Sequence, residues 1–333
     1  MDPLQASDVP VAEELLTVPP KFPQEPEVQG VNWLRSAGSL ALYLILGFLL
    51  FQSWDILLLL TLIVVLHELG HFAAMKAFRY KDLGIFFIPL LGAYVSGSKR
   101  EVSQRESAII LLAGPMPGII IGVVIYLITF YQQPFFIGDL SSLSISGFFI
   151  FLNLINLFPV YPLDGGQLLN RVFLDEDSWI SRGFVLLSIA FLVWFALYGF
   201  SQPVYPLLIF PAMMLYRMFG DKRLQQLEKK VEESGIDMNK SYEELPDEDY
   251  WKVRNIIIAE HPAFRNVSPA PPYAYHPRED KIQIVVESLL HRHLIQDMPV
   301  WGKLIVLVIW LAGLAAPWII GLGFSFLRAF GIG

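Results

Sequence analysis

Long apolar runs separated by short polar stretches dominate this chain. Seven of the runs have the length that a helix needs to cross the hydrocarbon core of a bilayer. They lie at residues 36–52, 55–78, 107–131, 146–163, 183–200, 203–219 and 301–327. The first two are separated only by the short stretch around Trp54, which predicts a tight helical hairpin, and Pro317 predicts a kink or a split in the last. The pattern therefore predicts six or seven transmembrane helices.

Residues 83–97 form an apolar stretch that is too short to cross a bilayer as a helix. Its β-branched and aromatic residues, together with Gly84, Gly92 and Gly97, favour a strand or a re-entrant hairpin. Irregular backbone at membrane depth is tolerated only where protein covers it or where it lines a wet cavity. We therefore expect a short β-like hairpin beside a cavity, next to the helix predicted at 55–78.

Polar composition sets two other parts of the chain apart. Residues 1–35 are polar, acidic and rich in proline, and no basic segment leads into a short apolar one. We interpret them as a mobile tail rather than as a signal or transit peptide. Charged helical patterns in residues 220–300 predict a soluble helical insert, most simply a linker domain. The predicted order is thus a tail (1–35), a transmembrane catalytic core (36–219), an insert (220–300) and a C-terminal transmembrane segment (301–333).

Overall composition agrees with a polytopic, all-α membrane protein. Only 17% of the 333 residues are charged, whereas soluble domains carry about 25%. The chain contains no cysteine, which excludes disulfides, thiolate metal sites and a cysteine nucleophile. A net charge of −7 gives no support for nucleic-acid binding.

Basic residues lie on one side of the predicted spans. They gather at or after the ends of the second and sixth runs. These residues are Lys76, Arg79, Lys81, Lys99, Arg100, Arg105, Lys222, Arg223, Lys229 and Lys230. The connections at 53–55, 132–145 and 199–204 contain no lysine or arginine. The positive-inside rule therefore places the N-terminus, the 76–105 loop and the 220–300 insert in the cytoplasm. The expected location is a bacterial cytoplasmic membrane.

Two histidines and a glutamate interrupt the second apolar run, in the sequence His67-Glu68-Leu69-Gly70-His71. Such groups are costly in lipid unless they have partners or a function. Histidines at positions i and i+4 project from one face of a helix, the spacing with which two imidazoles bind one Zn²⁺ while the intervening glutamate reaches the bound water. The alternative is a pair of hydrogen-bonded core imidazoles, which leaves the adjacent Glu68 unexplained.

A catalytic zinc also needs a third protein ligand and an open position for water. The remaining histidines lie in the predicted insert, at His261, His276, His291 and His293, and we interpret the last two as surface residues. Asp164 follows an apolar run at the depth expected for the two histidines, and prolines just before it disrupt helical hydrogen bonding. The alternative for Asp164 is a turn residue, because Asp-Gly is a strong turn signal.

Together the two motifs resemble those of the site-2 protease group of intramembrane zinc metalloproteases, peptidase family M50. The first matches its His-Glu-x-x-His, and residues 156–166 match its Asn-x-x-Pro…Leu-Asp-Gly motif. The resemblance covers about residues 55–170, the catalytic helical core of the family. It implies one Zn²⁺ per chain with three protein ligands, a catalytic base and a contact to the substrate backbone. The residues in these roles are His67, His71 and Asp164 as ligands, Glu68 as the base, and Asn156 as the substrate contact.

The chain also departs from the pattern of this family. The second proline of many members falls at Tyr161 here, with Pro162 one place later. Residues 113–118 resemble the Gly-Pro helix motif of the family, but Gly118 stands where many members have asparagine. We recognise no PDZ or CBS module. Gly92 and Gly97 are further candidates for substrate binding, with close backbone packing as their alternative role.

The resemblance implies a zinc metalloendopeptidase that cleaves a transmembrane segment of a membrane-anchored, regulatory protein within the lipid bilayer. One alternative is a non-proteolytic membrane protein with a structural or transported zinc. Another is a hydrolase of soluble peptides that faces the cytoplasm, which the depth of the histidines disfavours. The sequence identifies neither the substrate nor the oligomeric state.

Overall fold

The computed structural model describes residues 18–23, 33–88, 92–99, 102–174, 178–199, 202–220, 222–238, 240, 242–290 and 294–322. His291, His293, the predicted tail outside 18–23 and the end of the last apolar run lie outside the described residues. The chain divides into two compact units. The insert unit comprises Met1–Glu25 and Gly220–His291, and the membrane unit comprises Pro26–Phe219 and Arg292–Gly333.

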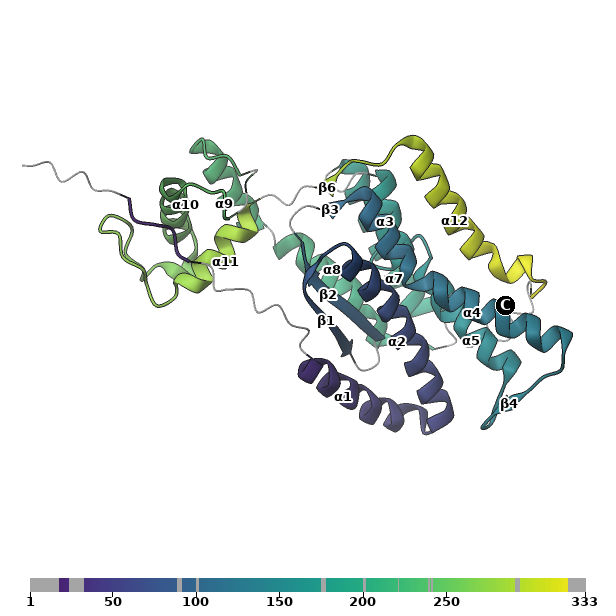
Figure 1. The fold of residues 1–333 in the computed structure, drawn as a ribbon. Helices are drawn as coiled ribbons and strands as arrows, with labels where there is room; N and C mark the ends of the chain where they lie inside the picture. The colour runs from purple at the N-terminus through teal and green to yellow at the C-terminus, as the bar shows by residue number, and fades with distance from the viewer. Residues whose placement is uncertain are drawn as a thin grey trace, which may run out of the picture. The chain divides into compact units, whose positions relative to one another are not determined.

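The membrane unit is mainly helical, as the apolar runs predict (Figure 1). Its helices are α1 (Trp33–Phe51), α2 (Trp54–Ala77), α3 (Gln104–Ala113), α4 (Pro115–Tyr131), α5 (Ser142–Asn156), α6 (Asp164–Leu168), α7 (Trp179–Tyr198), α8 (Ile209–Gly220) and α12 (Val300–Ile319). A π-helical turn follows α6 at Leu169–Leu174, and a 3₁₀ turn precedes α8 at Tyr205–Leu208. Ser53 caps the start of α2 by accepting a hydrogen bond from the main chain of Ile56, which ends the tight turn after α1.

Four helical segments in the described residues are long and apolar enough to cross a membrane, at Trp54–Ala77, Gln104–Tyr131, Trp179–Tyr198 and Val300–Ile319. Shorter apolar helices occupy Ser36–Leu49, Ser142–Asn156 and Tyr205–Tyr216. The chain is therefore a multi-pass protein by these criteria, and the count of six or seven spans stays a prediction. Pro317 lies inside α12, which continues to Ile319, so the helix is not split there.

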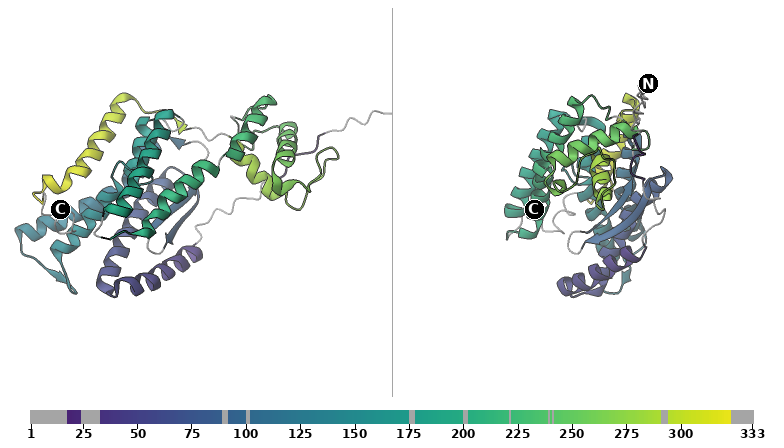
Figure 2. Two further views of the ribbon diagram at one scale, coloured as in Figure 1. Left: turned by 180° about the vertical axis from the view of Figure 1, so that it is seen from behind. Right: turned by 90° about the vertical axis from the view of Figure 1, so that its left-hand side faces the viewer.

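Residues 81–98 form an antiparallel hairpin of β1 (Lys81–Ile88) and β2 (Gly92–Ser98). Ile85 pairs with Val95, and Phe87 pairs with Ala93. Alternate side chains of β1 are buried against α1 and α2 in a cluster with Tyr43, so the hairpin covers one side of α2 (Figures 1 and 2). The predicted β-like hairpin is present, and its depth in a membrane stays a prediction.

Helices α3, α4 and α5 each pack against α2, and α12 contacts all three of them. The indole of Trp310 in α12 donates a 2.8 Å hydrogen bond to the carbonyl of Leu157, directly after α5. This bond ties the last helix to the segment that leads into α6. Two short pairings complete the unit: β3 (Val102–Ser103) with β6 (Leu294–Ile295), and β4 (Phe136–Ile137) with β5 (Leu140–Ser141).

The insert unit has a helical core of its own. It contains α9 (Lys222–Glu233), α10 (Asp247–Glu260), a 3₁₀ turn at Pro262–Phe264 and α11 (Glu279–Leu289). Fully buried side chains between these helices include Val231, Ile257 and Ile282. Residues 18–23, which composition assigns to a mobile tail, pack against this unit because their side chains and carbonyls find partners there that composition alone does not reveal.

Candidate metal centre

Helix α2 presents His67 and His71 on one buried face. Their side chains are one helical turn apart, as the i, i+4 spacing predicts, and their Nε2 atoms lie 3.1 Å from each other. Both residues are below one-tenth exposed, at 7% and 8%. Two imidazole nitrogens therefore point at the same small volume inside the membrane unit.

Asp164 brings a carboxylate to this volume from the start of α6. The chain bends after α5, and Leu163 is extended, so that the Asp164 side chain turns toward α2. Its Oδ2 lies 3.0 Å from the Nε2 of His67 and 3.3 Å from the Nε2 of His71. The three ligand atoms lie within 4.8 Å of one another. The folded chain thus brings together the three residues that the resemblance implies as ligands.

The outer nitrogen of each imidazole is bonded to a carbonyl oxygen. His67 Nδ1 lies 2.8 Å from Oδ1 of Asn153, and His71 Nδ1 lies 2.8 Å from the main-chain oxygen of Ile110. The Asn153 amide is oriented by its nitrogen, which donates to the carbonyl of Phe149. Since both partners are acceptors, each Nδ1 carries the hydrogen and each Nε2 turns a lone pair to the centre.

This arrangement fits a bound cation. Two imidazole lone pairs and the buried Oδ2 of Asp164, which has no hydrogen-bond partner, converge without a donor among them. Buried acceptors that face one another repel unless a proton or a metal lies between them. Tetrahedral Zn²⁺ with bonds of about 2.0–2.1 Å separates its ligands by roughly 3.3 Å. The observed separations of 3.0–3.3 Å therefore suit zinc with only small adjustments.

Glu68 adjoins the three ligands and is itself buried, at 6% exposure. The main chain of Val95 in β2 lies beside its carboxylate. The hairpin therefore lies next to the side chain that the sequence predicts as the base. A carboxylate beside the ligands is in a position to receive a proton from a group at the centre.

Two glycines leave space for the side chain of His71 and for that of Asn153, which bonds to His67. A Cβ atom on Gly114 would lie 2.3 Å from Nε2 of His71, and one on Gly118 would lie 2.1 Å from the amide nitrogen of Asn153. Gly118 is the departure from the family motif noted in the sequence. Here its missing side chain leaves the space that the amide of Asn153 occupies from α5.

Asn153 is a residue of this candidate site that sequence reasoning missed. It is 1% exposed and lies one turn before Asn156 on α5, where the motif does not reach. Its nearness to His67 depends on how α5 packs against α2 and α4, which no local pattern encodes. The unexplained Gly118 was the available signal, because a small residue on a packed helix marks a place where another side chain enters.

The predicted substrate contacts lie outside this cluster. Asn156 is half-buried at the end of α5, and its amide donates to the carbonyl of Leu152. Gly92 opens β2 with φ +101°, a turn conformation that favours glycine. A Cβ on Gly97 would lie 2.6 Å from Met75 of α2, so this glycine permits close packing of the hairpin. A role of these three residues in substrate binding stays a prediction.

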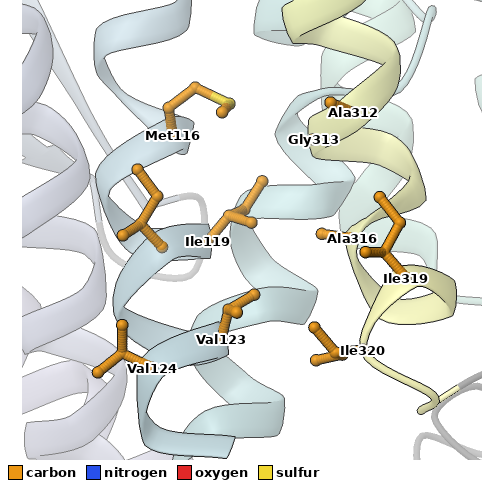
Figure 3. Close-up of a pocket in the computed structure, with 10 residues that line it drawn as sticks. Met116, Ile119, Val123, Val124, Ala312, Gly313, Ala316, Ile319 and Ile320 are labelled. Atoms are coloured by element: carbon orange, nitrogen blue, oxygen red, sulfur yellow. The ribbon is translucent and has the colours of Figure 1, made fainter. Parts of the chain in front are cut away.

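A separate apolar pocket lies between α4 and α12 (Figure 3). Its lining consists of Met116, Ile119, Ile120, Val123, Val124, Ala312, Gly313, Ala316, Ile319 and Ile320. None of these side chains titrates, so the pocket offers mainly contact to hydrocarbon. Among the described residues, the histidine and aspartate cluster is the group that could hold a metal ion.

Comparisons with known proteins agree with this geometry. Residues 55–149 match the family model of peptidase family M50. The chain is 31% identical over 121 residues to stage IV sporulation protein FB of Bacillus subtilis, covering 35% of this chain and 40% of the relative. It is 28% identical over 128 residues to a zinc metalloprotease of Methanocaldococcus jannaschii, covering 38% and 37%. The chain thus spans about two fifths of the length of these relatives.

Among solved structures, the site-2 protease from Methanocaldococcus jannaschii is similar with a TM-score of 0.39 and 21% identity, over 53% of this chain and 82% of that one. The family match covers the two histidines and Glu68, and it ends before Asp164. Residues 55–149 of this chain are accordingly similar to peptidase family M50.

Proposed function

We propose that this chain is an intramembrane zinc endopeptidase that cleaves a transmembrane segment of a membrane-anchored regulatory protein. The observation that carries the proposal is the convergence of His67, His71 and Asp164, with Glu68 beside them, on a long apolar helix. The match to peptidase family M50 and the similarity to a zinc metalloprotease support it. One Zn²⁺ per chain is proposed, because one cluster of this kind occurs in the described residues.

The proposed roles follow from the positions of the side chains. His67, His71 and Asp164 hold the zinc, which supplies, when bound, a water of lowered pKa and a Lewis acid for the scissile carbonyl. Glu68 takes a proton from the attacking water and passes it to the leaving amide nitrogen. Two neutral imidazoles and one carboxylate leave a dication with one net positive charge, which suits a developing oxyanion.

A helical substrate must be unwound locally, because its own hydrogen bonds hide the peptide carbonyls. The contact between Val95 and Glu68 supports a role for β2 in this step, since it brings a strand next to the base. We propose that the unwound substrate lies along the hairpin by strand addition, near Gly92 and Gly97, with Asn156 on its other side. Segments with helix-weakening residues are then cut preferentially.

The proposed topology has six or seven spans, a re-entrant hairpin and a cytoplasmic insert. Residues 18–23 support one part of it, because they bind to the insert although they precede the first helix. The N-terminal segment and the 220–290 region therefore lie on the same side of the membrane. The positive-inside rule makes this side the cytoplasm.

The decisive test is Glu68→Gln, assayed on a model transmembrane peptide. We expect cleavage to fall by about 10²–10⁴-fold, because the proton acceptor is lost. Elemental analysis should still find zinc, since the three ligands are unchanged. Glu106→Gln on α3, whose carboxylate is paired with Lys99 away from the ligands, is the matched control and should cleave normally. Cleavage at the wild-type rate by Glu68→Gln would refute the mechanism.

A structural or transported zinc is the alternative. A structural site has four protein ligands and no open position, whereas three ligands converge among the described residues. Inhibition of cleavage by a chelator and by a hydroxamate, which competes for an open coordination position, separates the two functions. Zinc-loaded protein that leaves helical membrane peptides intact would favour a structural or transported zinc. Preferential cleavage of short soluble peptides would favour a hydrolase that faces the cytoplasm.

A further inference from the structure

Residues 18–23, with the sequence Val-Pro-Pro-Lys-Phe-Pro, lie on an aromatic surface of the insert unit. We call this surface the aromatic groove and define it by Tyr242, Asp247, Trp251 and Tyr275. Each of these residues bonds to the segment across 220 or more positions of the chain. The groove and its occupant therefore meet only through the fold, and they meet within one compact unit.

Side chains of the groove bind the main chain of the segment. The indole of Trp251 donates to the carbonyl of Pro19 at 2.9 Å, and the hydroxyl of Tyr242 donates to the carbonyl of Phe22 at 2.8 Å. The hydroxyl of Tyr275 donates to the carbonyl of Pro20. Burial raises the pKa of Tyr242 above its ordinary range, so this hydroxyl stays a donor. Aromatic donors that reach free main-chain carbonyls are the means by which grooves recognise extended proline-rich peptides.

Lys21 is recognised through both its main chain and its side chain. Its amide donates to Oδ1 of Asp247 at 2.9 Å. Its ammonium group donates to the carbonyls of Glu243 and Leu245 at 2.8 and 2.6 Å, and lies 5.7 Å from the centre of the Tyr242 ring. Two carbonyls and an aromatic face suit a cation with several donors. These contacts suit a basic residue after the two prolines.

The core of the insert unit closes without this segment. Its buried residues all come from positions 227–290, whereas Val18 and Phe22 are only partly buried against them. The Phe22 ring meets Tyr275 edge-on at 5.3 Å between centroids, at the rim of the groove. The segment thus lies on the surface of a core that is built from other residues, and it contributes no fully buried side chain to that core.

Side chains of the groove are also held by one another and by residues beneath them. Trp251 stacks on Tyr275 with an interplanar angle of 12°, and the guanidinium of Arg254 lies 5.0 Å from the Trp251 ring. Arg254 is in turn held by the carboxylate of Glu279, and both residues are 1% exposed. Aromatic donors held in this way lose little freedom on binding a peptide, which favours affinity.

We propose that the aromatic groove is a binding site for a proline-rich segment of a partner protein, and that residues 18–23 are its intramolecular ligand. The partner segment carries two prolines, a basic residue, an aromatic residue and a further proline, because those are the features that the groove contacts. Tethering gives the resident segment an effective concentration on the order of millimolar, so a partner must compete with it. Binding of the partner releases the segment that precedes α1.

The experiment uses the full chain in detergent with a site-specific protease site inserted after Glu25, so that the protein folds with its own segment and is cut afterwards. The probe is a fluorescent peptide with the sequence of residues 18–23. We expect its apparent affinity to rise at least 10-fold after the cut, because the competitor is no longer tethered. No binding to the cut chain overturns the proposal, and so does unfolding of the insert on loss of the fragment.

Matched variants test which contacts recognise the peptide. Tyr275→Phe should weaken the probe about fivefold, the value of one neutral hydrogen bond. Tyr273→Phe is the control, because Tyr273 touches the edge of the Trp251 ring without bonding to residues 18–23. A probe with alanine in place of lysine should bind at least 10-fold more weakly. Equal binding of the lysine and alanine probes contradicts the proposed selectivity. If the groove binds only residues 18–23 of a second copy of the chain, so that dimers form, the proposal of a partner protein is contradicted.

Discussion

Each unit of this protein buries charged or metal-binding side chains, and the two clusters differ in how their hydrogen bonds are satisfied. In the insert unit, Glu279 accepts from Arg254, from the hydroxyl of Tyr250 and from the main chain of His276. In the membrane unit, the Oδ2 of Asp164 is buried without a donor and faces two imidazole nitrogens. A closed network of this kind supports a fold, whereas converging acceptors leave a place for a ligand.

The largest expected difference comes from removing one carboxylate in each cluster. Asp164→Ala should lose zinc and activity and leave the insert folded, because it removes a ligand and no structural bond. Glu279→Leu should keep zinc and destabilise the insert by about 3–5 kcal/mol, because Arg254 stays buried and unpaired. Elemental analysis and hydrogen exchange measure the two effects. Full zinc occupancy in Asp164→Ala would remove this residue from the ligand set.

A smaller effect is expected when both members of the closed pair are replaced. Arg254→Met combined with Glu279→Leu should destabilise the insert less than Glu279→Leu alone, because no charge is left buried. Denaturant unfolding followed by tryptophan fluorescence measures the two free energies. A double variant as unstable as the single one would show that the bonds of Arg254 to the carbonyls of Ser268 and Ala274 carry the stability instead.

The hydrogen bond between His67 and Asn153 offers a test of intermediate size in the membrane unit. Asn153→Leu should lower zinc affinity about 10–100-fold, because the outer bond that orients the imidazole is lost. Gly118→Ala should act in the same direction by displacing the Asn153 amide. Chelator competition measures both affinities. Ser146→Ala is the control: Ser146 is equally buried on α5, but its hydroxyl donates to the carbonyl of Gly122, away from the ligands.

The smallest effect should come from an exposed ion pair of the insert. Lys230 pairs with Glu260 on the surface, where both side chains are more than two-fifths exposed. Lys230→Ala should change stability by less than about 1 kcal/mol, because water and salt screen the pair. Thermal unfolding in low and high salt checks this value. A loss as large as that of Glu279→Leu would erase the distinction between buried and exposed charge.

Local patterns predicted much of the membrane unit. The spacing of His67 and His71 predicts a shared face because helix geometry is set by neighbours in sequence. The β-branched and aromatic residues near Ile85 predicted the hairpin for a similar reason. Local reasoning did not reach Asn153, because its bond to His67 depends on how two helices pack. Nor did it reach residues 18–23, whose polar and proline-rich composition predicts a mobile tail.

By itself, the sequence determined that this chain is apolar enough to enter a membrane and that α2 carries a zinc-binding motif. It also linked that motif to Asp164 through a resemblance. The tertiary structure decided that the three ligand atoms meet, that Asn153 and the carbonyl of Ile110 orient the imidazoles, and that β2 lies next to Glu68. The physical reason is distance along the chain: helical periodicity reports on neighbours, whereas a metal centre is built from segments that only packing brings together.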